Sequence, residues 1–233
     1  MKIPVVDPLL ILLAALPGLL ICWYIYRTDK YEHESQWQVL LAFTLGAAAT
    51  YPIIQLEEWI STHYVRSSYQ IGNLLLFSFL AVALLEEIIK FTVLLLFFYP
   101  RRFFNEPLDG IVYSVIVAMG FATAENMLYA MEYGLGTTIL RAFTAVPAHA
   151  VFAVLIGYYV GKAKFKKAVQ NRLLIKGLIF AVLAHGLYDV LIFQRIYEGL
   201  LILVIAFIWV AIYFERELIK KQREESPFKE SQE

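Results

Sequence analysis

Long apolar segments separated by short polar connections run along the whole chain. Seven of these segments can each carry an α-helix across about 30 Å of hydrocarbon, at a rise of about 1.5 Å per residue, and the last is the shortest. No connection between them is long enough to fold as a separate soluble domain. We therefore predict an all-α, polytopic membrane helical bundle that forms one domain over residues 1–233. The predicted spans are 8–26, 37–56, 72–99, 109–132, 138–160, 173–193 and 199–214.

The composition supports a membrane protein and narrows its chemistry. The 233 residues are 60% hydrophobic, and 20 basic residues balance 20 acidic ones. Cys22 is the single cysteine, so an intramolecular disulfide and a thiolate metal cluster are excluded. Any metal would have to be held by imidazole and carboxylate groups.

Positive charge is concentrated in alternate connections and in the C-terminal tail. The positive-inside rule places these segments in the cytoplasm, which predicts an amino terminus outside and a carboxyl terminus inside the cell. The basic run Lys162–Arg172 lies beside a span, so we expect it to contact anionic lipid headgroups rather than nucleic acid. The residues on this side are Arg27, Lys30, Arg101, Arg102, Lys162, Lys164, Lys166, Lys167, Arg172, Lys176, Arg216, Lys220, Lys221, Arg223 and Lys229.

Ionisable and amide side chains lie inside four of the predicted spans. An ionisable group at the centre of a bilayer costs about 2.5–3.5 kcal/mol on insertion scales, so such groups usually mark a functional site. Counted along their spans, Glu86, His149 and His185 reach the middle of the membrane together, with Glu125 nearer the outer face. The full set is Glu86, Glu87 and Lys90, then Glu125 and Asn126, then His149, then His185 and Asp189.

The spacing of these residues predicts local pairs. Lys90 lies four residues after Glu86 and three after Glu87, so it can pair with either carboxylate on one helix face. Asp189 lies four residues after His185, where it can accept the second ring N–H and fix the tautomer. A structural ion-pair cluster that ties helices together is the simplest alternative for the first group.

Two histidines and several carboxylates from different helices would suit a zinc site with one position open to water. Glu86 or Glu87 would then act as the general base on that water, whose pKa the metal lowers to about 7. The chain contains no His-Glu-x-x-His string. Spacing therefore supports a metal without specifying one.

Local geometry around these residues is also predicted. The apolar stretch 72–99 is longer than a perpendicular crossing needs, so it is tilted or interrupted near its acidic pair. Small residues around Gly120 allow a neighbouring helix to approach, which turns Glu125 toward protein. Pro147, two residues before His149, is expected to kink the fifth span.

Three further charged residues are assigned to the membrane interface. Glu57 and Glu58 end the second span and are interpreted as an interfacial pair. Arg141 enters the fifth span by about one turn and is expected to snorkel to the outer interface. The alternative for Arg141 is a contact with a substrate carbonyl.

The motifs as a set resemble one known family. Glu86-Glu87-Ile88-Ile89-Lys90 resembles the EExxK motif of the PrsW family of intramembrane proteases, and Phe121-Ala122-Thr123-Ala124-Glu125-Asn126 resembles its FxxxEN motif. Leu108-Asp109-Gly110-Ile111-Val112-Tyr113, His149 with Gly157, and His185-Gly186-Leu187-Tyr188-Asp189 resemble further landmarks in the same order. The family is distantly similar to the CAAX prenyl endopeptidases and bacteriocin-processing proteins, which carry a histidine where this chain has Glu125.

The resemblance implies a multi-pass protease of the bacterial cell membrane. Its substrate would be a single-pass membrane protein, with a first, extracytoplasmic-side cut in an anti-sigma factor that starts a stress response. The implied cofactor is zinc, with a metal-independent glutamate protease as the alternative mechanism. A proton-coupled or ion-coupled transporter and a non-catalytic membrane binding protein are the alternatives outside proteolysis.

A working assignment of roles follows from the spacing and the resemblance together. We expect one residue to act as the general base, three to bind metal and one to polarise the scissile carbonyl. The others would orient or neutralise these groups. The expected base is Glu86, and Glu87 is a catalytic residue that orients or neutralises through Lys90. The expected metal ligands are Glu125, His149 and His185, Asn126 is the carbonyl-polarising residue, and Asp189 is the partner of His185.

Overall fold

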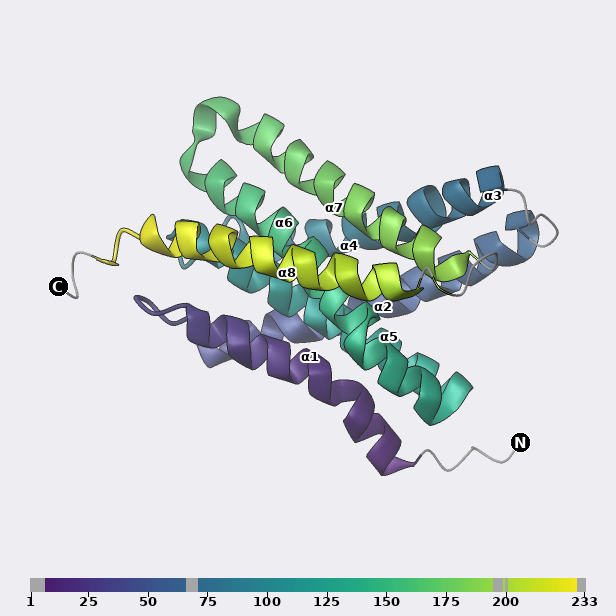
Figure 1. Cartoon of the computed structure of the whole chain (residues 1–233). Helices are drawn as coiled ribbons and strands as arrows, with labels where there is room; N and C mark the ends of the chain where they lie inside the picture. The colour runs from purple at the N-terminus through teal and green to yellow at the C-terminus, as the bar shows by residue number, and fades with distance from the viewer. Residues whose placement is uncertain (1–6, 66–70, 195–198, 200, 230–233) are drawn as a thin grey trace.

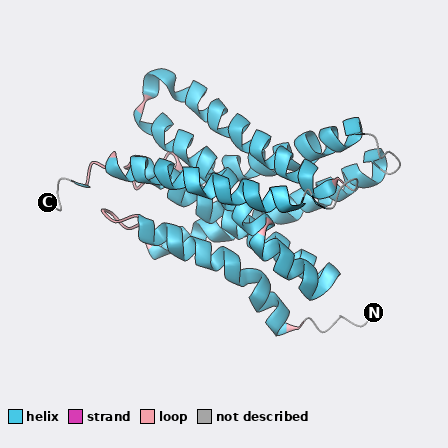
Figure 2. Cartoon of the chain, in the orientation of Figure 1, coloured by secondary structure: helices cyan, strands magenta, loops and turns pink. Residues whose placement is uncertain are grey.

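The computed structural model describes residues 7–65, 71–194, 199 and 201–229, and this part of the chain is helical with no strand (Figure 2). The all-α prediction is therefore confirmed. The α-helices are α1 (Pro8–Thr28), α2 (Gln36–Ile60), α3 (Ile71–Leu76), α4 (Leu84–Val93), α5 (Pro107–Phe143), α6 (Ala145–Phe165), α7 (Gln170–Phe193) and α8 (Leu201–Glu224). Shorter π-helical turns are η1 (Ser61–Val65), η2 (Phe77–Ala83) and η3 (Leu94–Phe98), and η4 (Lys167–Val169) is a 3₁₀ turn.

Helices lie at all of the predicted spans, but the count of seven is not confirmed. Within the described residues, four helical segments are long and apolar enough to cross a membrane. One of them, Pro107–Phe165, combines α5 and α6, where the sequence predicted two spans. The four segments are Pro8–Thr28, Gln36–His63, Pro107–Phe165 and Lys167–Phe193.

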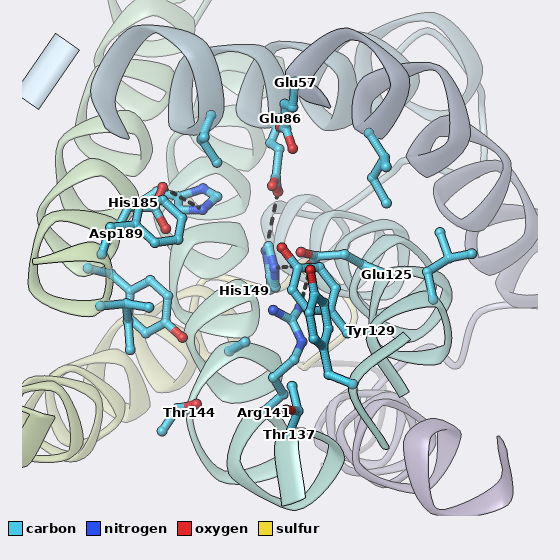
Figure 3. Close-up of a pocket in the computed structure, with 18 of the residues that line it drawn as sticks. Glu57, Glu86, Glu125, Tyr129, Thr137, Arg141, Thr144, His149, His185 and Asp189 are labelled. Carbon is cyan, nitrogen blue, oxygen red and sulfur yellow. Dashed lines mark hydrogen bonds and ion pairs between the residues drawn. The ribbon is translucent and has the colours of Figure 1, made fainter. Parts of the chain in front are cut away.

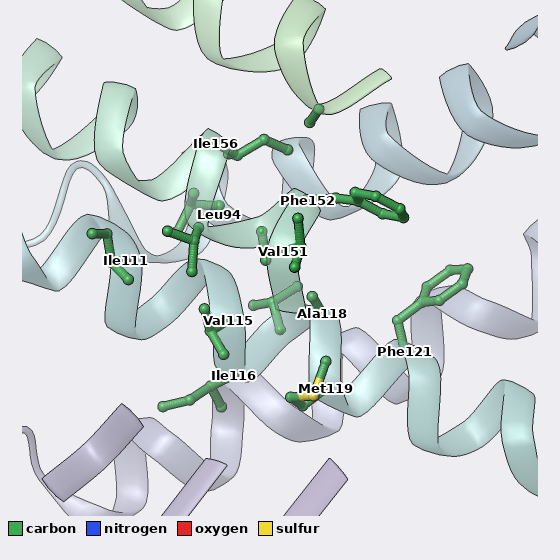
Figure 4. Close-up of a cluster of buried hydrophobic side chains, with 14 of the residues drawn as sticks. Leu94, Ile111, Val115, Ile116, Ala118, Met119, Phe121, Val151, Phe152 and Ile156 are labelled. Carbon is green, nitrogen blue, oxygen red and sulfur yellow. The ribbon is translucent and has the colours of Figure 1, made fainter. Parts of the chain in front are cut away.

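Helix α5 is the centre of the bundle. Its first half, from Pro107 to Thr123, is buried along its whole length by α1, α2 and α6, and α1 and α8 lie on the outside (Figure 1). Side chains of α5, α6 and η3 meet in the apolar core drawn in Figure 4. Large apolar side chains point outward from α1, α2, α7 and α8, for example Trp37 and Trp209, which are 74% and 65% exposed. An apolar exterior of this kind is suited to lipid rather than to water.

Helices α2 and α5 approach closely at a glycine. A Cβ atom on Gly120 would lie 2.0 Å from the carbonyl oxygen of Phe43, so only glycine permits this crossing. Lipid tails are as apolar as the side chains that face them, and close packing of small residues is a main source of helix association in membranes. The crossing comes just before Glu125, which is 8% exposed and faces protein, as predicted.

The acidic pair sits on a helix with irregular flanks. The stretch from Ile71 to Phe98 is helical throughout, but π-helical turns η2 and η3 lie on either side of the α-helical part α4. The α-helical hydrogen bonding is therefore interrupted on both sides of the acidic pair, although the stretch stays helical, and the tilt of this stretch stays a prediction. Wide π turns re-aim side chains relative to a regular helix and occur often at functional sites.

The boundary between α5 and α6 differs from the prediction. Gly134 has φ +77°, and the chain changes direction there within α5. Helix α6 then begins at Ala145, so Pro147 lies in its first turn, where the missing N–H has no intrahelical partner to lose. The kink expected at Pro147 is wrong for this reason.

Acidic side chains meet at the end of the bundle that carries the basic connections. Ser226 donates to Glu106, and Tyr113 donates to Glu34, so the tail and the α1–α2 connection both join the start of α5. Burial, followed by the negative charge of Glu106, raises the pKa of Asp29 to about 8. Burial likewise raises the pKa of Glu34 to about 7.

Candidate functional site

A cavity of about 600 Å³ opens between α2, α4, α5, α6 and α7 (Figure 3). It lies toward the last turns of α2 and α7 and the first turn of α6, at the opposite end of the bundle from Glu106 and Ser226. Five of the predicted site residues line it. They are Glu86, Glu125, His149, His185 and Asp189.

Helix α4 supplies two adjacent glutamates in different positions. Glu86 lines the cavity, whereas Glu87 lies behind it and is 1% exposed. The ammonium nitrogen of Lys90 lies 2.6 Å from Glu87 Oε1 and 3.3 Å from Glu86 Oε2. The predicted pairs at three and four residues are both formed, and Lys90 is closer to the buried glutamate.

His149, on α6, bridges two carboxylates. Its Nε2 lies 3.1 Å from Glu125 Oε2, and its Nδ1 lies 3.8 Å from Glu86 Oε2. The Nδ1 atom also lies 3.2 Å from Lys90 Nζ. An ammonium group only donates, so these contacts assign the ring proton to Nε2, which donates to Glu125.

His185, on α7, has a similar environment. Its Nδ1 lies 2.8 Å from Glu87 Oε1, and its Nε2 faces Asp189 Oδ2 at 3.5 Å. The predicted pair of His185 and Asp189 is therefore present one turn apart on α7. The ring stacks on Phe152 with centroids 4.5 Å apart, and it meets the His149 ring edge to face at 5.3 Å. Packing on both sides fixes the orientation of the imidazole.

One ligand atom from each of Glu86, Glu87, His149 and His185 lies within 4.8 Å of the others, and all four residues are buried. Two imidazoles with carboxylates form a donor set that suits zinc. Each histidine also turns its other ring nitrogen toward a carboxylate, Glu125 or Asp189, the usual arrangement around a metal-binding histidine. The residues present therefore fit a divalent metal, with Glu125 beside the set rather than in it.

Arg141 reaches into the site instead of toward the interface. Its Nη2 lies 2.8 Å from Glu125 Oε2, and its side chain is 14% exposed. The guanidinium carbon lies 4.0 Å from the centroid of the Tyr129 ring. The predicted snorkelling is wrong, because the change of direction at Gly134 returns the chain toward Glu125.

Asn126 is fully buried and does not line the cavity. Its Nδ2 donates to the carbonyl oxygen of Ala14 at 2.8 Å, and its Oδ1 accepts from Arg141 Nε at 3.3 Å. The side chain thereby joins α1 to α5 and holds the guanidinium. Polarisation of a substrate carbonyl by Asn126 stays a prediction, and both ends of its amide are engaged here.

The sequence interpretation missed two carboxylates of the cavity. Glu57 and Glu58 line its wall, and Figure 3 places Glu57 directly beside Glu86. They line the cavity because α2 continues to Ile60 and this last turn covers it, and their position at the membrane interface stays a prediction. A pair of acids at the end of an apolar run gives no signal of which side they face, so their spacing could not have identified this role.

A family model and several known proteins match most of this chain. The model of the family described as "PrsW family intramembrane metalloprotease" matches residues 34–214. Protease PrsW of Geobacillus kaustophilus is 37% identical over 200 residues, which cover 84% of this chain and 86% of the relative. Protease PrsW of Bacillus subtilis is 37% identical over 175 residues, covering 74% and 78%.

A third relative also matches most of this chain. Protease PrsW of Clostridioides difficile is 34% identical over 205 residues, covering 85% of each chain. No solved structure matches this chain. The family match spans most of the chain and includes every residue of the buried cluster. The chain therefore belongs to the PrsW family of intramembrane metalloproteases and is a membrane-embedded peptidase.

Proposed function

We propose that this enzyme hydrolyses a peptide bond of a single-pass membrane protein within the cavity, with Glu86 as the general base. The carrying observation is the difference between the two adjacent glutamates. Glu86 lines the cavity beside His149 and His185, whereas Glu87 is buried behind it against Lys90 and His185. A base must reach the attacking water, which favours Glu86 for that role.

The remaining charged residues have supporting roles. Glu87 accepts from Lys90 and faces His185, so it fixes the charge and position of both groups. Glu125 and Asp189 orient the two imidazoles through their second ring nitrogens. Glu86 takes a proton from the attacking water and delivers it to the amine nitrogen as the C–N bond breaks.

The proposed cofactor is zinc, held by His149, His185 and Glu87. When bound, such an ion polarises the water and lowers its pKa to about 7. Glu87 replaces the earlier assignment of Glu125 as the acidic ligand, because Glu87 belongs to the cluster whose ligand atoms converge. The apolar helices around the cluster exclude bulk water, and this strengthens the electrostatic interactions within the cluster.

The proposed substrate is an anti-sigma factor with one membrane span in a bacterial cell membrane. The cavity opens at the end of the bundle away from the basic connections. With those connections in the cytoplasm, as the positive-inside rule predicts, the cut falls on the extracytoplasmic half of the membrane. This orientation gives an amino terminus outside and a carboxyl terminus inside the cell.

A metal-independent glutamate mechanism is the second candidate, and Lys90 favours it. The ammonium group contacts Glu86, Glu87 and His149, three of the four residues that would surround a metal. In that mechanism Lys90 supplies the positive charge of the site, and Glu86 with a histidine activates water directly.

Cleavage of a tagged anti-sigma factor in purified proteoliposomes tests these proposals. We expect cleavage by the wild type, loss of cleavage in Glu86→Gln and His185→Ala, and loss with a chelator that added zinc reverses. Cleavage that resists the chelator but needs Glu86 would select the glutamate mechanism. Cleavage retained by Glu86→Gln would reject its role, and no wild-type cleavage of any tested single-pass substrate would favour transport or non-catalytic binding.

A further inference from the structure

We propose that Arg141 binds the carbonyl oxygen of the scissile peptide and stabilises the oxyanion that forms there. This inference rests on the proposed function, since it requires peptide hydrolysis in the cavity. The residue lies outside the EExxK and FxxxEN motifs and outside the four-residue cluster.

Arg141 is next to the reacting groups. It lines the cavity together with Glu125 and His149, and Figure 3 shows its guanidinium beside both side chains. Arg141 Nη2 and His149 Nε2 contact the same atom, Glu125 Oε2, at 2.8 and 3.1 Å. On the far edge of the imidazole, Nδ1 lies 3.8 Å from Glu86. A peptide between Glu86 and Arg141 would therefore have the base on one side of its carbonyl carbon and a cation on the other.

The guanidinium keeps donors available. It has five N–H groups. Nε donates to Asn126, and Nη2 forms its ion pair with Glu125 off the hydrogen-bonding direction, so it has no hydrogen-bond partner. Nη1 has no hydrogen-bond or ion-pair partner among the described residues. An arginine serving only to neutralise Glu125 would be expected to align its donors with that carboxylate.

Three neighbours hold the guanidinium in place. Asn126 accepts from Nε, Tyr129 stacks against the plane at 4.0 Å, and Glu125 supplies the opposite charge. All three side chains come from one stretch of α5, before the change of direction at Gly134. Preorganised donors stabilise a developing charge without a reorganisation cost at the moment of reaction.

This arrangement gives Asn126 a positioning role. Its Nδ2 donates to the Ala14 carbonyl and its Oδ1 accepts from Arg141, and the side chain does not line the cavity. The residue is fully buried behind the arginine. Asn126 thus acts on the carbonyl through Arg141, in place of the direct polarisation expected from the sequence.

Water and Glu86 account for every proton transferred in the proposed step. Water oxygen bonds to the carbonyl carbon, the C=O pair moves to oxygen, and Glu86 takes one water proton. Arg141 donates hydrogen bonds to the resulting oxyanion. The C=O bond then re-forms, the C–N bond breaks, and the nitrogen takes the proton from Glu86, which leaves a carboxyl and an amine product. Removing one oxyanion donor typically lowers kcat by roughly 10²–10³-fold.

The test compares Arg141→Ala, Arg141→Lys and Asn126→Ala with wild type and with Arg172→Ala, an exposed arginine of α7. The tagged single-pass substrate is cleaved in proteoliposomes, and kcat and KM are measured separately. We expect Arg141→Ala to lose roughly 10²–10³-fold in kcat with KM within about threefold. Arg141→Lys should keep part of the rate, and Asn126→Ala should lose less than Arg141→Ala.

Chemical rescue separates this role from a structural one. Millimolar guanidinium should restore part of the kcat of Arg141→Ala and leave wild type, Glu86→Gln and Arg172→Ala unchanged. Thermal unfolding shows whether Arg141→Ala folds. If it does not, Arg141→Lys is compared with wild type instead, because it keeps the positive charge beside Glu125. The inference is overturned if Arg141→Ala cleaves within threefold of wild type while Glu86→Gln is inactive, or if guanidinium rescues nothing. If Glu86→Gln still cleaves, the proposed function fails instead.

Discussion

The ammonium nitrogen of Lys90 lies 3.2 Å from Nδ1 of His149, so two side chains that can carry positive charge meet inside the buried site. The contact makes Nδ1 an acceptor and leaves the Nε2 proton for Glu125. Nδ1 is also the atom that faces Glu86. An ammonium and a metal ion would therefore compete for the same imidazole nitrogen.

Replacement of Lys90 should raise the affinity for zinc. We expect Lys90→Met to bind zinc at least about tenfold more tightly than wild type and to be less stable without it, because two buried carboxylates lose their counter-charge. Zinc should restore the lost stability, since a ligand that binds only the folded state stabilises it. Isothermal titration and thermal unfolding with and without zinc measure both effects, with the exposed Lys220→Met as control. Unchanged or weaker zinc binding would show that Lys90 does not compete.

Replacement of Glu125 distinguishes a metal ligand from a residue that orients one. Because Glu125 contacts the outer nitrogen of His149, we expect Glu125→Gln to lower zinc affinity by roughly 10–100-fold and His149→Ala to abolish binding. Metal content and titration of the purified variants measure the difference. The control is Glu132→Gln, an exposed carboxylate on the cavity wall. If Glu125→Gln binds as poorly as His149→Ala, Glu125 is a direct ligand, as first expected from the sequence.

Alanine at Gly120 should separate α2 from α5. The added Cβ would lie 2.0 Å from the Phe43 carbonyl oxygen, so backbone has to move, at a cost of about 1–3 kcal/mol. We expect a lower Tm in detergent. Gly72→Ala is the matched control, since nothing lies within 4 Å of its added Cβ, and there the better helix propensity of alanine should hold or raise Tm. Equal Tm values for the two variants would contradict the close packing.

The acidic residues at the basic end of the bundle predict a dependence of stability on pH. The pKa of Asp29 is raised to about 8 and that of Glu34 to about 7 by burial and neighbouring carboxylates. A raised carboxyl pKa contributes stability at low pH that is lost as pH rises through the folded-state value. We therefore expect Tm to fall as pH rises from about 4, near the ordinary carboxyl pKa, to about 8, the raised pKa of Asp29.

Asp29→Asn tests this dependence, because its amide cannot ionise. The variant should lose less Tm than wild type over the same pH range. Glu217→Gln, at an exposed position of α8, should behave as wild type does. An identical pH profile for Asp29→Asn and wild type would mean that Asp29 does not ionise in this range.

The helices and the cluster follow from the sequence more directly than the contacts around them. Apolar length predicts a helix because unpaired backbone groups are too costly in lipid, and the depth of Glu86, His149 and His185 within their segments brought them to one level. The depth of Arg141, counted along a straight helix, is predicted wrongly. Its depth depends on Gly134, whose conformation is not encoded in hydrophobic periodicity.

Other differences have similar causes. The sequence predicts a kink at Pro147 because it does not show that α6 begins at Ala145. That start is set by the preceding break and not by a capping motif. The apolar run of α2 ends before Glu57 although the helix continues to Ile60, so that run does not indicate that Glu57 lines the cavity. Which of two adjacent glutamates faces the cavity depends on the π turns around α4, and those turns have no clear sequence signature.

The positive φ of Gly134 sets the distance between Asn126 and Arg141. Fifteen residues separate Asn126 from Arg141, a distance of about 22 Å along an unbroken helix. The break at Gly134 replaces that distance with a 3.3 Å hydrogen bond, because residues 135–143 run back toward Asn126 before α6 begins at Ala145. The alignment of the site therefore depends on one backbone angle that only glycine adopts without strain.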